Sequence, residues 1–474
     1  MSADFPEIPF LRGWDAGRKL VLDECQQSLE EGKDCILVGS IQKRAEALDP
    51  SDHQGAFLLW REVSQLPVLE DFPYHEPNNL AEIHAARGPG WRSALLPYGD
   101  EELLQRLHGA WLGRSIGCAL GRPVECFSYG NIPQMNGRQR IKAFLSALPG
   151  EYPLCDYFPS ASPADHETGK PECPGSRRDG IRFMESDDDI IYTVLGQLVM
   201  RNAGSSFTTR DVAAAWMDHL SYNFVCTAET QAYRNLVIRY RIPGWVDEPV
   251  DWNWVATHQN PYREWIGAQI RADSWGYAAP GNPEQAAEFA WRDARMTHVK
   301  NGIYGEMFVA AMIAAGFVLS NPLEVVQAGL AEIPARSRLH ADIIHTLEIC
   351  RRHRFDFARF EAVLDDLYEA FGHYHWVHTN NNAALVVAAL LLGGGDFEKT
   401  VTLAVMGGWD TDCNGATVGS IWGTIHGVER IPDKWKKPLN DTLCSAVIDY
   451  HPIAISECAR RSLEIVQKNR NAAN

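Results

Sequence analysis

The chain contains 474 residues, 45% of them hydrophobic, so it can bury a large core and exceeds the roughly 100 to 200 residues of a typical single domain. Its formal charge is −17, from 44 Lys and Arg against 61 Asp and Glu. This balance argues against a nucleic-acid partner, because phosphate groups require a basic surface, and the excess of carboxylates suits divalent cations.

Other features of the sequence bear on where the protein works. No apolar run approaches the ~20 residues of a membrane span, and the first residues lack the basic and apolar segments of a secretory signal. The eleven cysteines are widely spaced without a CxxC pair, which is typical of reduced thiols. We therefore expect a soluble, cytoplasmic protein without a membrane or nucleic-acid partner. The oligomeric state is not indicated.

Residues 1–98 are expected to form an N-terminal helical extension, and residues 99–474 the main domain. Within the extension, helical spacing of apolar residues is found over 18–30 and 55–62. A Pro-rich connector follows, around residues 73–77 and 88–90.

After residue 100, apolar residues recur mostly at three- and four-residue spacing, which predicts helices. The clearest stretches are 101–121, 190–203, 305–319, 339–351, 380–393 and 455–467. Strand-like alternation is scarce, so the predicted fold class is all-α. Two segments rich in Pro, Gly, acidic residues or Trp, 127–185 and 241–283, break the helical rhythm and are expected to be irregular lids or binding loops.

Two segments carry glycine at every fourth position. They are Gly109, Gly113, Gly117 and Gly121, and then Gly415, Gly419, Gly423 and Gly427. Because glycine costs an exposed helix about 1 kcal/mol relative to alanine, each glycine face needs a compensating contact, such as a closely approaching backbone. Membrane helix dimerisation is the alternative, but Arg114, Arg122 and the shortness of both segments argue against it. Pro123 should end the first helix and leave Glu125 in the following loop.

The first acidic cluster, Ser186-Asp187-Asp188-Asp189, stands at the start of a helix expected from Ile190 and follows Glu185. One interpretation is a helix cap, since a serine N-cap and acids in the first turn complement the helix dipole. Four acids within the five residues 185–189 exceed what a cap needs, because neighbouring like charges repel by about 1 kcal/mol in water and by more when desolvated. A bound cation would remove that cost.

Histidines and short motifs give weaker signals. The run His373, His375 and His378 has no cysteine nearby to complete a zinc site, so partly exposed loop histidines are expected, with substrate contact through His378 and residues 380–382 as the alternative. His298 is interpreted as a packed histidine or a substrate contact. Residues 113–117 match the GxSxG nucleophile elbow, but helical periodicity runs through both sides of it. No GxxxxGK[ST], HExxH or GxGxxG motif occurs.

The second acidic cluster, Asp410-Thr411-Asp412, lies in the glycine-rich turn GGWDTDCNG at residues 407–415. Its DxDxNG string matches the start of a calcium EF-hand loop, but loop position 12 would be Ile421, which has no oxygen ligand. What remains is a pair of carboxylates that can face one hard cation, such as Mg²⁺, Mn²⁺ or Ca²⁺. Together with the first cluster and Glu125, it forms one plausible acidic site.

The order of four motifs resembles the ADP-ribosylglycohydrolase family, which includes hydrolases that remove ADP-ribose from proteins. The motifs are GAWLGRSIGCALGRPVE (109–125), SDDD (186–189), THVKNGIYGE (297–306) and GGWDTDCNGATVGSIWGTIHG (407–427). The resemblance covers about 101–440, and the first and last motifs are its most specific parts. It implies a compact orthogonal helical bundle that holds two Mg²⁺ or similar ions, with residues 99–474 as the catalytic domain.

The resemblance also implies roles for individual residues. The metal ligands would be Ser186, Asp187, Asp188, Asp410, Asp412 and Cys413. Glu125 and Asp188 would be the catalytic carboxylates. Substrate contacts are expected from Trp409, Gly408, His298 and His378.

The sequence departs from the family's pattern at several of these positions. Cys413 replaces a Thr or Ser ligand, Cys118 stands where an Asp is usual, and Asp189 stands where a Thr is frequent. Because a thiol is a soft, poor partner for Mg²⁺, the second ion is expected to bind weakly, to be a different metal or to be held through water. Trp409 replaces a small or polar residue and would wall the pocket or stack on a ligand ring.

The expected activity is metal-dependent hydrolysis of ribosyl N- or O-glycosidic bonds in an ADP-ribosylated or smaller substrate. One carboxylate would move a proton, and the surrounding acids would tolerate the positive charge that develops at the anomeric carbon. Two alternatives stay open. One is hydrolysis of a small glycoside or nucleoside at the same metal site, and the other is a ligand-binding protein that has lost turnover, as Cys118 and Cys413 would permit.

Overall fold

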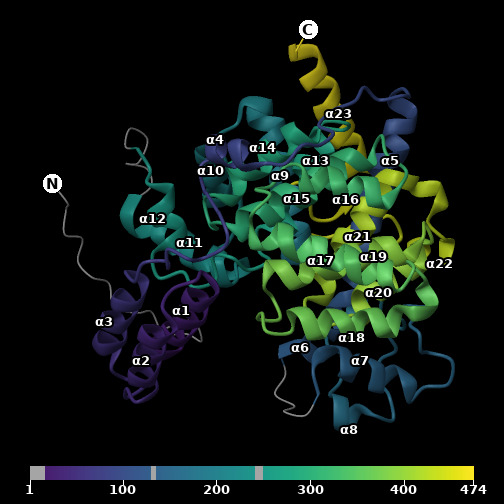
Figure 1. The fold of residues 1–474 in the computed structure, drawn as a ribbon. Helices are drawn as coiled ribbons and strands as arrows, with labels where there is room; N and C mark the ends of the chain where they lie inside the picture. The colour runs from purple at the N-terminus through teal and green to yellow at the C-terminus, as the bar shows by residue number, and fades with distance from the viewer. Residues whose placement is uncertain (1–16, 130–134, 241–248, 474) are drawn as a thin grey trace.

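Helices make up nearly all the regular structure of the chain (Figure 1). The structure, a computed structural model, describes residues 17–129, 135–240 and 249–473. Within these ranges the named strands are β1 (Thr442–Leu443) and β2 (Ile453–Ala454), two residues each, which pair antiparallel. The predicted all-α fold class is confirmed.

The N-terminal segment folds into short helices, which lie at the lower left of Figure 1 apart from α4. They are α1 (Arg18–Glu30), α2 (Cys35–Glu46), α3 (His53–Ser64) and α4 (Leu80–Ala86). Helices α1 and α3 cover the two predicted stretches. Asp34 caps the N-terminus of helix α2, because its side chain accepts hydrogen bonds from the backbone N–H groups of Ile36 and Leu37.

The predicted helices of the main domain are all present. They correspond to α5 (Asp100–Gly121), α9 (Asp188–Ala203), α15 (Asn301–Gly316), α17 (Arg338–Arg352), α19 (Thr379–Gly393) and α23 (Ile455–Ala473). Helices α15 and α19 are buried along their whole length, which explains their apolar sequences without a polar face. Two further helices of the interior are α20 (Phe397–Met406) and α21 (Thr411–His426).

The remaining helices surround this interior. The α-helices are α6 (Cys126–Tyr129), α7 (Gly137–Ser146), α8 (Asp165–Thr168), α10 (Thr209–His219), α11 (Thr227–Tyr240), α12 (Trp252–Thr257), α13 (Asp273–Ala278), α14 (Pro283–Ala294), α16 (Pro322–Leu330), α18 (Phe360–Phe371) and α22 (Asp433–Lys436). Short 3-10 helices are η1 (Arg122–Val124), η2 (Pro174–Ser176), η3 (Gly204–Ser206), η4 (Tyr222–Phe224), η5 (Gln269–Arg271), η6 (Phe357–Arg359), η7 (Val428–Arg430) and η8 (Lys437–Leu439).

The expectation that 127–185 and 241–283 are irregular is wrong in part. Helix α7 lies in the first segment, and α12 and α13 lie in the second. Helix α7 starts with a capping box, in which Asn136 and Gln139 bond reciprocally, and this local signal outweighs the Pro- and Gly-rich surroundings. Residues 130–134 and 241–248 of these segments lie outside the described residues.

The two glycine-ridged helices, α5 and α21, pack antiparallel and in backbone contact. A Cβ atom at Gly117 would overlap the carbonyl group of Gly415, and one at Gly113 would overlap that of Gly419. The closely approaching backbone that each glycine face was expected to need is therefore that of the other helix. At one end of this pair, the last residues of α5 lie beside the first residues of α21, because Thr411 Oγ1 donates to the carbonyl of Gly121 at 2.8 Å.

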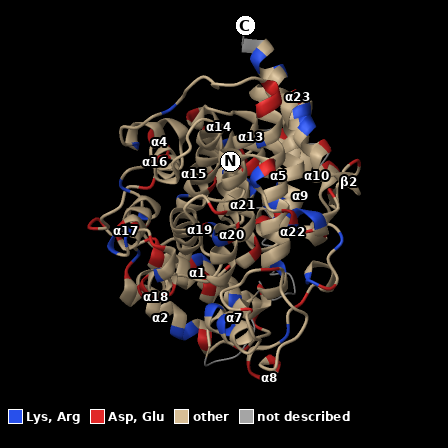
Figure 2. Ribbon diagram, turned by 90° about the vertical axis from the view of Figure 1, so that its right-hand side faces the viewer, with Lys and Arg blue, Asp and Glu red and all other residues tan. Residues whose placement is uncertain are grey.

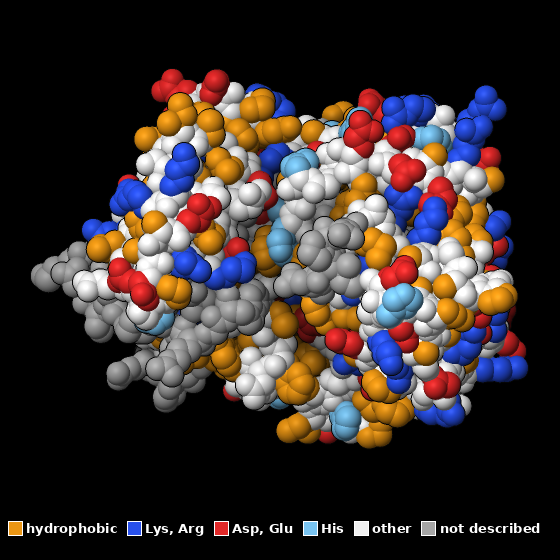
Figure 3. All heavy atoms as spheres, turned by 90° about the horizontal axis from the view of Figure 1, so that it is seen from below, with side chains coloured by type: hydrophobic (Ala, Val, Ile, Leu, Met, Phe, Trp, Pro, Cys, Tyr) orange, Lys and Arg blue, Asp and Glu red, His pale blue; other side chains and the backbone are white. Residues whose placement is uncertain are grey.

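Charged residues are spread over the outer helices and loops (Figure 2). On the face seen from below, basic and acidic side chains are interspersed (Figure 3). No helix among the described residues is long and apolar enough to cross a bilayer.

Buried ion pairs join the N-terminal segment to the rest of the chain. Arg263 contacts Glu24 at 2.9 Å and Glu31 at 3.0 Å, and all three side chains are buried. Arg338 contacts Glu76 at 2.7 Å and also Glu264. Loss of one partner of such a pair leaves an uncompensated buried charge. The packing of the N-terminal segment on the rest of the chain therefore depends on the partners from both parts. The division into residues 1–98 and 99–474 stays a prediction.

Glu30 lies at the same interface and gives it a pH dependence. Its Oε2 atom is 3.5 Å from Nε2 of His378, and Glu264 and Arg338 also face it. Burial, with a smaller contribution from Glu264, raises the pKa of Glu30 to about 7, and burial lowers the pKa of His378 to about 3. Because His378 is neutral, this interface stabilises the protonated, uncharged form of Glu30.

The stabilising effect of protonated Glu30 is complete below the ordinary carboxyl pKa and is lost as pH rises through about 7. Glu30→Gln keeps the uncharged shape, so the variant should match the wild type near pH 4 and exceed its free energy of unfolding by roughly 2 to 3 kcal/mol at pH 8. Urea unfolding of both proteins across this range measures the difference. A difference that does not change with pH would contradict the assignment.

Candidate metal centre

The turn before α21 presents Asp410 through an unusual backbone path. Gly408 and Trp409 both have positive φ, 73° and 56°, and Asp410 follows as the N-cap of α21. A Cβ atom at Gly408 would lie 2.6 Å from the backbone nitrogen of Arg138, so only glycine fits. The left-handed conformation costs Trp409 about 1 to 2 kcal/mol, and stacking on Tyr368, with ring centroids 4.5 Å apart, helps to offset it.

Asn382, on α19, holds this turn in place. Its fully buried Oδ1 accepts hydrogen bonds from the backbone N–H of Asp410 at 3.1 Å and from Nδ2 of Asn414 at 2.7 Å. Its Nδ2 donates to the carbonyls of Trp376 and His378. Asn382, one of the three residues weighed as substrate contacts, thus positions Asp410 in this structure.

The start of α9 is held against α5 by Arg114. Its Nη2 donates to the backbone carbonyl of Asp189 at 2.7 Å and to Oδ1 of the same residue at 3.0 Å, and Nη1 lies 2.7 Å from Oδ2 of Asp273. All three side chains are fully buried. Asp187 is the N-cap of α9 and accepts a hydrogen bond from the N–H of Asp189 at 3.1 Å. Capping and cation binding are therefore compatible roles for this cluster.

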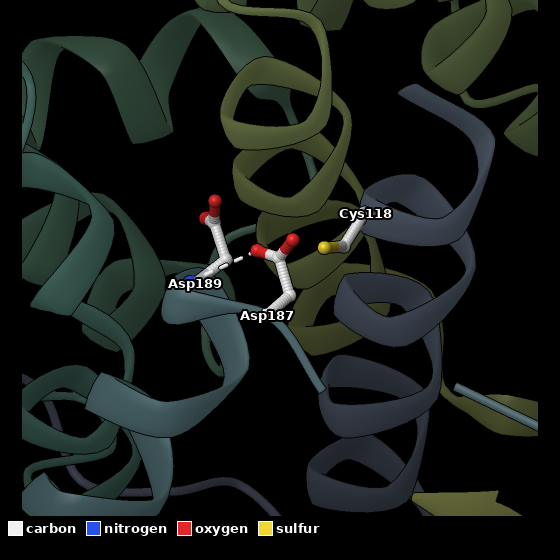
Figure 4. Close-up of side chains that lie close together, drawn as sticks. All are labelled: Cys118, Asp187 and Asp189. Carbon is white, nitrogen blue, oxygen red and sulfur yellow. Dashed lines mark hydrogen bonds between the residues drawn. The ribbon is translucent and has the colours of Figure 1, made fainter. Parts of the chain in front are cut away.

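These contacts bring the two acidic clusters together. Sγ of Cys413 donates to Oδ2 of Asp189 at 3.1 Å, across a separation of 224 residues. Two triads of possible ligand atoms form there, Cys118, Asp187 and Asp189 in one, and Asp410, Asp412 and Cys413 in the other, each within 4.8 Å of one another. Figure 4 shows Cys118 projecting from α5 toward Asp187 at the start of α9.

Arg122 provides part of the neutralising charge at this place. Its Nε lies 3.0 Å from Oδ2 of Asp187, and its Nη1 lies 3.4 Å from Oε2 of Glu185. Asp189 in turn is paired with Arg114. The direct contact between Cys413 and Asp189 shows that the clusters also meet without an intervening arginine.

Several oxygen atoms of the cluster are suited to bind a cation, because the described side chains around them do not satisfy them. Oδ1 of Asp410 and Oδ1 of Asp412 are buried without a hydrogen-bond partner among the described residues, and so is Oγ of Ser186. Each aspartate is only 4% exposed. Burial and the charge of Asp187 raise the pKa of Asp412 to about 6, and burial together with Asp412 raises the pKa of Asp410. A divalent cation would satisfy these oxygens and offset the repulsion.

The model of the ADP-ribosylglycohydrolase family matches residues 99–469. The chain belongs to the ADP-ribosylglycohydrolase family. A solved structure described as an ADP-ribosylglycohydrolase-related protein complex is 18% identical, and the match covers 78% of this chain and 99% of that chain at a TM-score of 0.47. A search of curated proteins finds no match.

In this ADP-ribosylglycohydrolase family member, Glu125 and Asp188 are partly exposed residues of the cluster, as is Glu185. Helix α5 ends at Gly121, as Pro123 predicted, and Glu125 lies in the turn between η1 and α6. Burial and the charge of Asp412 raise the pKa of Glu125, and burial and the charge of Asp187 raise that of Asp188. A carboxyl group with a raised pKa and access to solvent is suited to proton transfer near neutral pH.

The predicted histidine contacts lie elsewhere. His298 and His378 are fully buried, and no contact of either ring with the acidic cluster is found among the described residues. His298 lies 2.7 Å from Oγ1 of Thr297, while His378 caps α19 and stacks on Tyr374. The expectation of a partly exposed loop is therefore wrong for His378. The substrate-binding roles of both histidines stay predictions.

The other sequence signals have structural explanations. Ser115, the candidate elbow nucleophile, lies inside α5 and donates to the carbonyl of Trp111. Arg114 and Arg122, which the sequence argument used only against a membrane helix, both contact the cluster. The signal that could have identified Arg114 is a charged residue within an otherwise apolar, glycine-ridged helix, because a buried arginine requires an acidic partner.

Proposed function

We propose that the protein is a divalent-cation-dependent hydrolase of ribosyl N- or O-glycosidic bonds that acts on an ADP-ribosylated substrate. The observation that carries the proposal is the convergence of two helix N-termini, those of α9 and α21, on buried carboxylate oxygens that have no hydrogen-bond partner in the described part of the chain. Two partly exposed acidic residues, Glu125 and Asp188, lie beside them. Membership of a family of glycohydrolases supports the class of reaction. A cytoplasmic location remains a prediction from the sequence.

The cation ligands would come from both clusters. They are Ser186, Asp187 and Asp188 from the start of α9, and Asp410, Asp412 and Cys413 from the start of α21. The positive ends of the α9 and α21 helix dipoles point at the same acids and stabilise their negative charges. Bound divalent cations would supply positive charge that orients ribose hydroxyl groups and polarises water.

The chain's own residues would carry the remaining steps. Glu125 or Asp188 would give a proton to the leaving group or take one from water, because both have raised pKa values and access to solvent. The surrounding carboxylates would stabilise the positive charge that develops at the anomeric carbon. Trp409, packed against Tyr368, would form a rigid wall beside Asp410, and Gly408 would permit that turn.

The test is release of ADP-ribose from an ADP-ribosylated protein, measured beside nucleosides and simple glycosides in the presence of Mg²⁺, Mn²⁺ or Zn²⁺. We expect release from the ADP-ribosylated protein, and we expect Glu125→Gln to lower kcat by about 10² to 10⁴ while cation binding persists. Glu101→Gln, at an exposed position of α5, is the matched control and should retain full activity.

The outcomes distinguish the alternatives. Cleavage of only nucleosides or simple glycosides would move the activity to a small substrate at the same site. Bound cation without turnover of any substrate would favour a ligand-binding protein. Full activity of Glu125→Gln would remove Glu125 from the proposed mechanism.

A further inference from the structure

Each of the two triads contains a cysteine. Cys118 shares one with Asp187 and Asp189, and Cys413 shares the other with Asp410 and Asp412. In Figure 4 the sulfur of Cys118 points at the Asp187 carboxylate, from a side chain that is fully buried. Beside Cys413, Oδ1 of Asp410 and Oδ1 of Asp412 are buried without a hydrogen-bond partner among the described residues. Beside Cys118, Asp187 is paired with Arg122, and Asp189 is paired with Arg114.

The setting of these thiols differs from that of an ordinary buried cysteine. Cys118 is surrounded by the carboxylates of Asp187, Asp189 and Asp412. Cys350, on α17, is buried to the same degree and also belongs to the hydrophobic core, but no carboxylate of the described residues is among the groups that act on its thiol. A small apolar side chain gains little from burial among carboxylates, whereas a metal ligand belongs there.

Sulfur changes which cation such a site prefers. Mg²⁺ takes oxygen ligands in octahedral geometry and keeps several waters, whereas thiolates bind Zn²⁺ and similar borderline ions. Two carboxylates and one thiolate are three protein ligands, which is the number that catalytic zinc sites use before water fills the fourth position. Oδ2 of Asp189, which now accepts from Cys413, would be free to act as a ligand once that proton has left.

We infer that Cys118 and Cys413 are metal ligands and that this site selects a zinc-type divalent cation over Mg²⁺. Each sulfur–metal bond would form as the thiol proton is released to solvent, with no change of oxidation state. The inference rests on the proposed metal site, and it does not depend on which glycosidic bond is cleaved.

The experiment is titration of the metal-free protein with Co²⁺, which reports sulfur ligation through near-ultraviolet charge-transfer absorption, followed by competition with Zn²⁺ and Mg²⁺. We expect this absorption in the wild type and its reduction in Cys118→Ser and in Cys413→Ser. Each serine variant should bind Zn²⁺ at least about tenfold more weakly and lose little Mg²⁺ affinity. Cys350→Ser is the matched control, and its absorption and affinities should equal those of the wild type.

Two results would overturn the inference. One is the absence of sulfur-to-cobalt absorption in the wild type, and the other is an unchanged preference for Zn²⁺ over Mg²⁺ in both serine variants. If a variant fails to fold, X-ray absorption at the zinc edge of the wild-type protein determines whether sulfur binds the metal, because this measurement needs no substitution. A first shell with sulfur supports the inference, and a shell of oxygen and nitrogen alone refutes it.

Activity measurements keep the two proposals separate. An enzyme that releases ADP-ribose with Mg²⁺ and shows no sulfur ligation would refute this inference and leave the proposed function intact. Sulfur ligation without hydrolysis of any glycoside would support the inference and refute the proposed function.

Discussion

Gly117→Ala is expected to lower the free energy of unfolding by about 3 kcal/mol. The added methyl group would overlap the carbonyl of Gly415 and approach the backbone nitrogen of Ala416 within 2.8 Å. Because the obstacle is backbone rather than a flexible side chain, α5 and α21 would have to move apart. Their separation would also displace Asp410 and Asp412 from Asp187, so cation affinity should fall along with stability.

Gly39→Ala is the matched control for this substitution. Gly39 also lies inside a helix, α2, but an added Cβ there has nothing within 4 Å. Alanine should therefore leave the stability unchanged or raise it by about 0.5 to 1 kcal/mol. Urea unfolding followed by circular dichroism measures both variants. If Gly117→Ala unfolds within about 0.5 kcal/mol of the wild type, α5 and α21 are not in backbone contact.

Asp410→Asn is expected to remove the stabilisation of the protein by divalent cations without unfolding it. Oδ1 of Asp410 is buried without a hydrogen-bond partner among the described residues, and asparagine keeps the shape of the side chain while it removes the charge. In the metal-free protein this substitution relieves repulsion from Asp412, and the variant should be as stable as the wild type or more stable.

Thermal unfolding with increasing Mn²⁺ or Zn²⁺ measures the effect. The wild type should gain about 2.7 kcal/mol when the cation is a hundredfold above its dissociation constant, and Asp410→Asn should gain almost nothing. Asp187→Asn is expected to behave in the same way. Asp71→Asn, at an exposed position outside the cluster, should retain the full gain. An undiminished gain in Asp410→Asn would show that Asp410 is not a ligand.

The sequence determined the all-α class and most of the interior helices because these depend on local patterns. Apolar spacing located α1 from Arg18 to Glu30, and Pro123 marked the end of α5. Capping signals are equally local, and the Asn136–Gln139 box of α7 was readable in principle although the surrounding Pro and Gly concealed it. The acidic clusters were also visible, since runs of like charge without nearby partners require an explanation.

Only the tertiary structure decided which distant groups meet. The glycine ridges showed that each helix needed a close neighbour, but spacing within one ridge carries no information about the identity of its partner. In the same way, the contact between Asp189 and Cys413 and the role of Asn382 depend on how α9, α19 and α21 pack, over separations that no local preference spans. Burial was likewise decided by the whole fold. His378 was expected in a partly exposed loop and is fully buried, whereas for His298, which is also fully buried, the sequence had left open a packed histidine or a substrate contact.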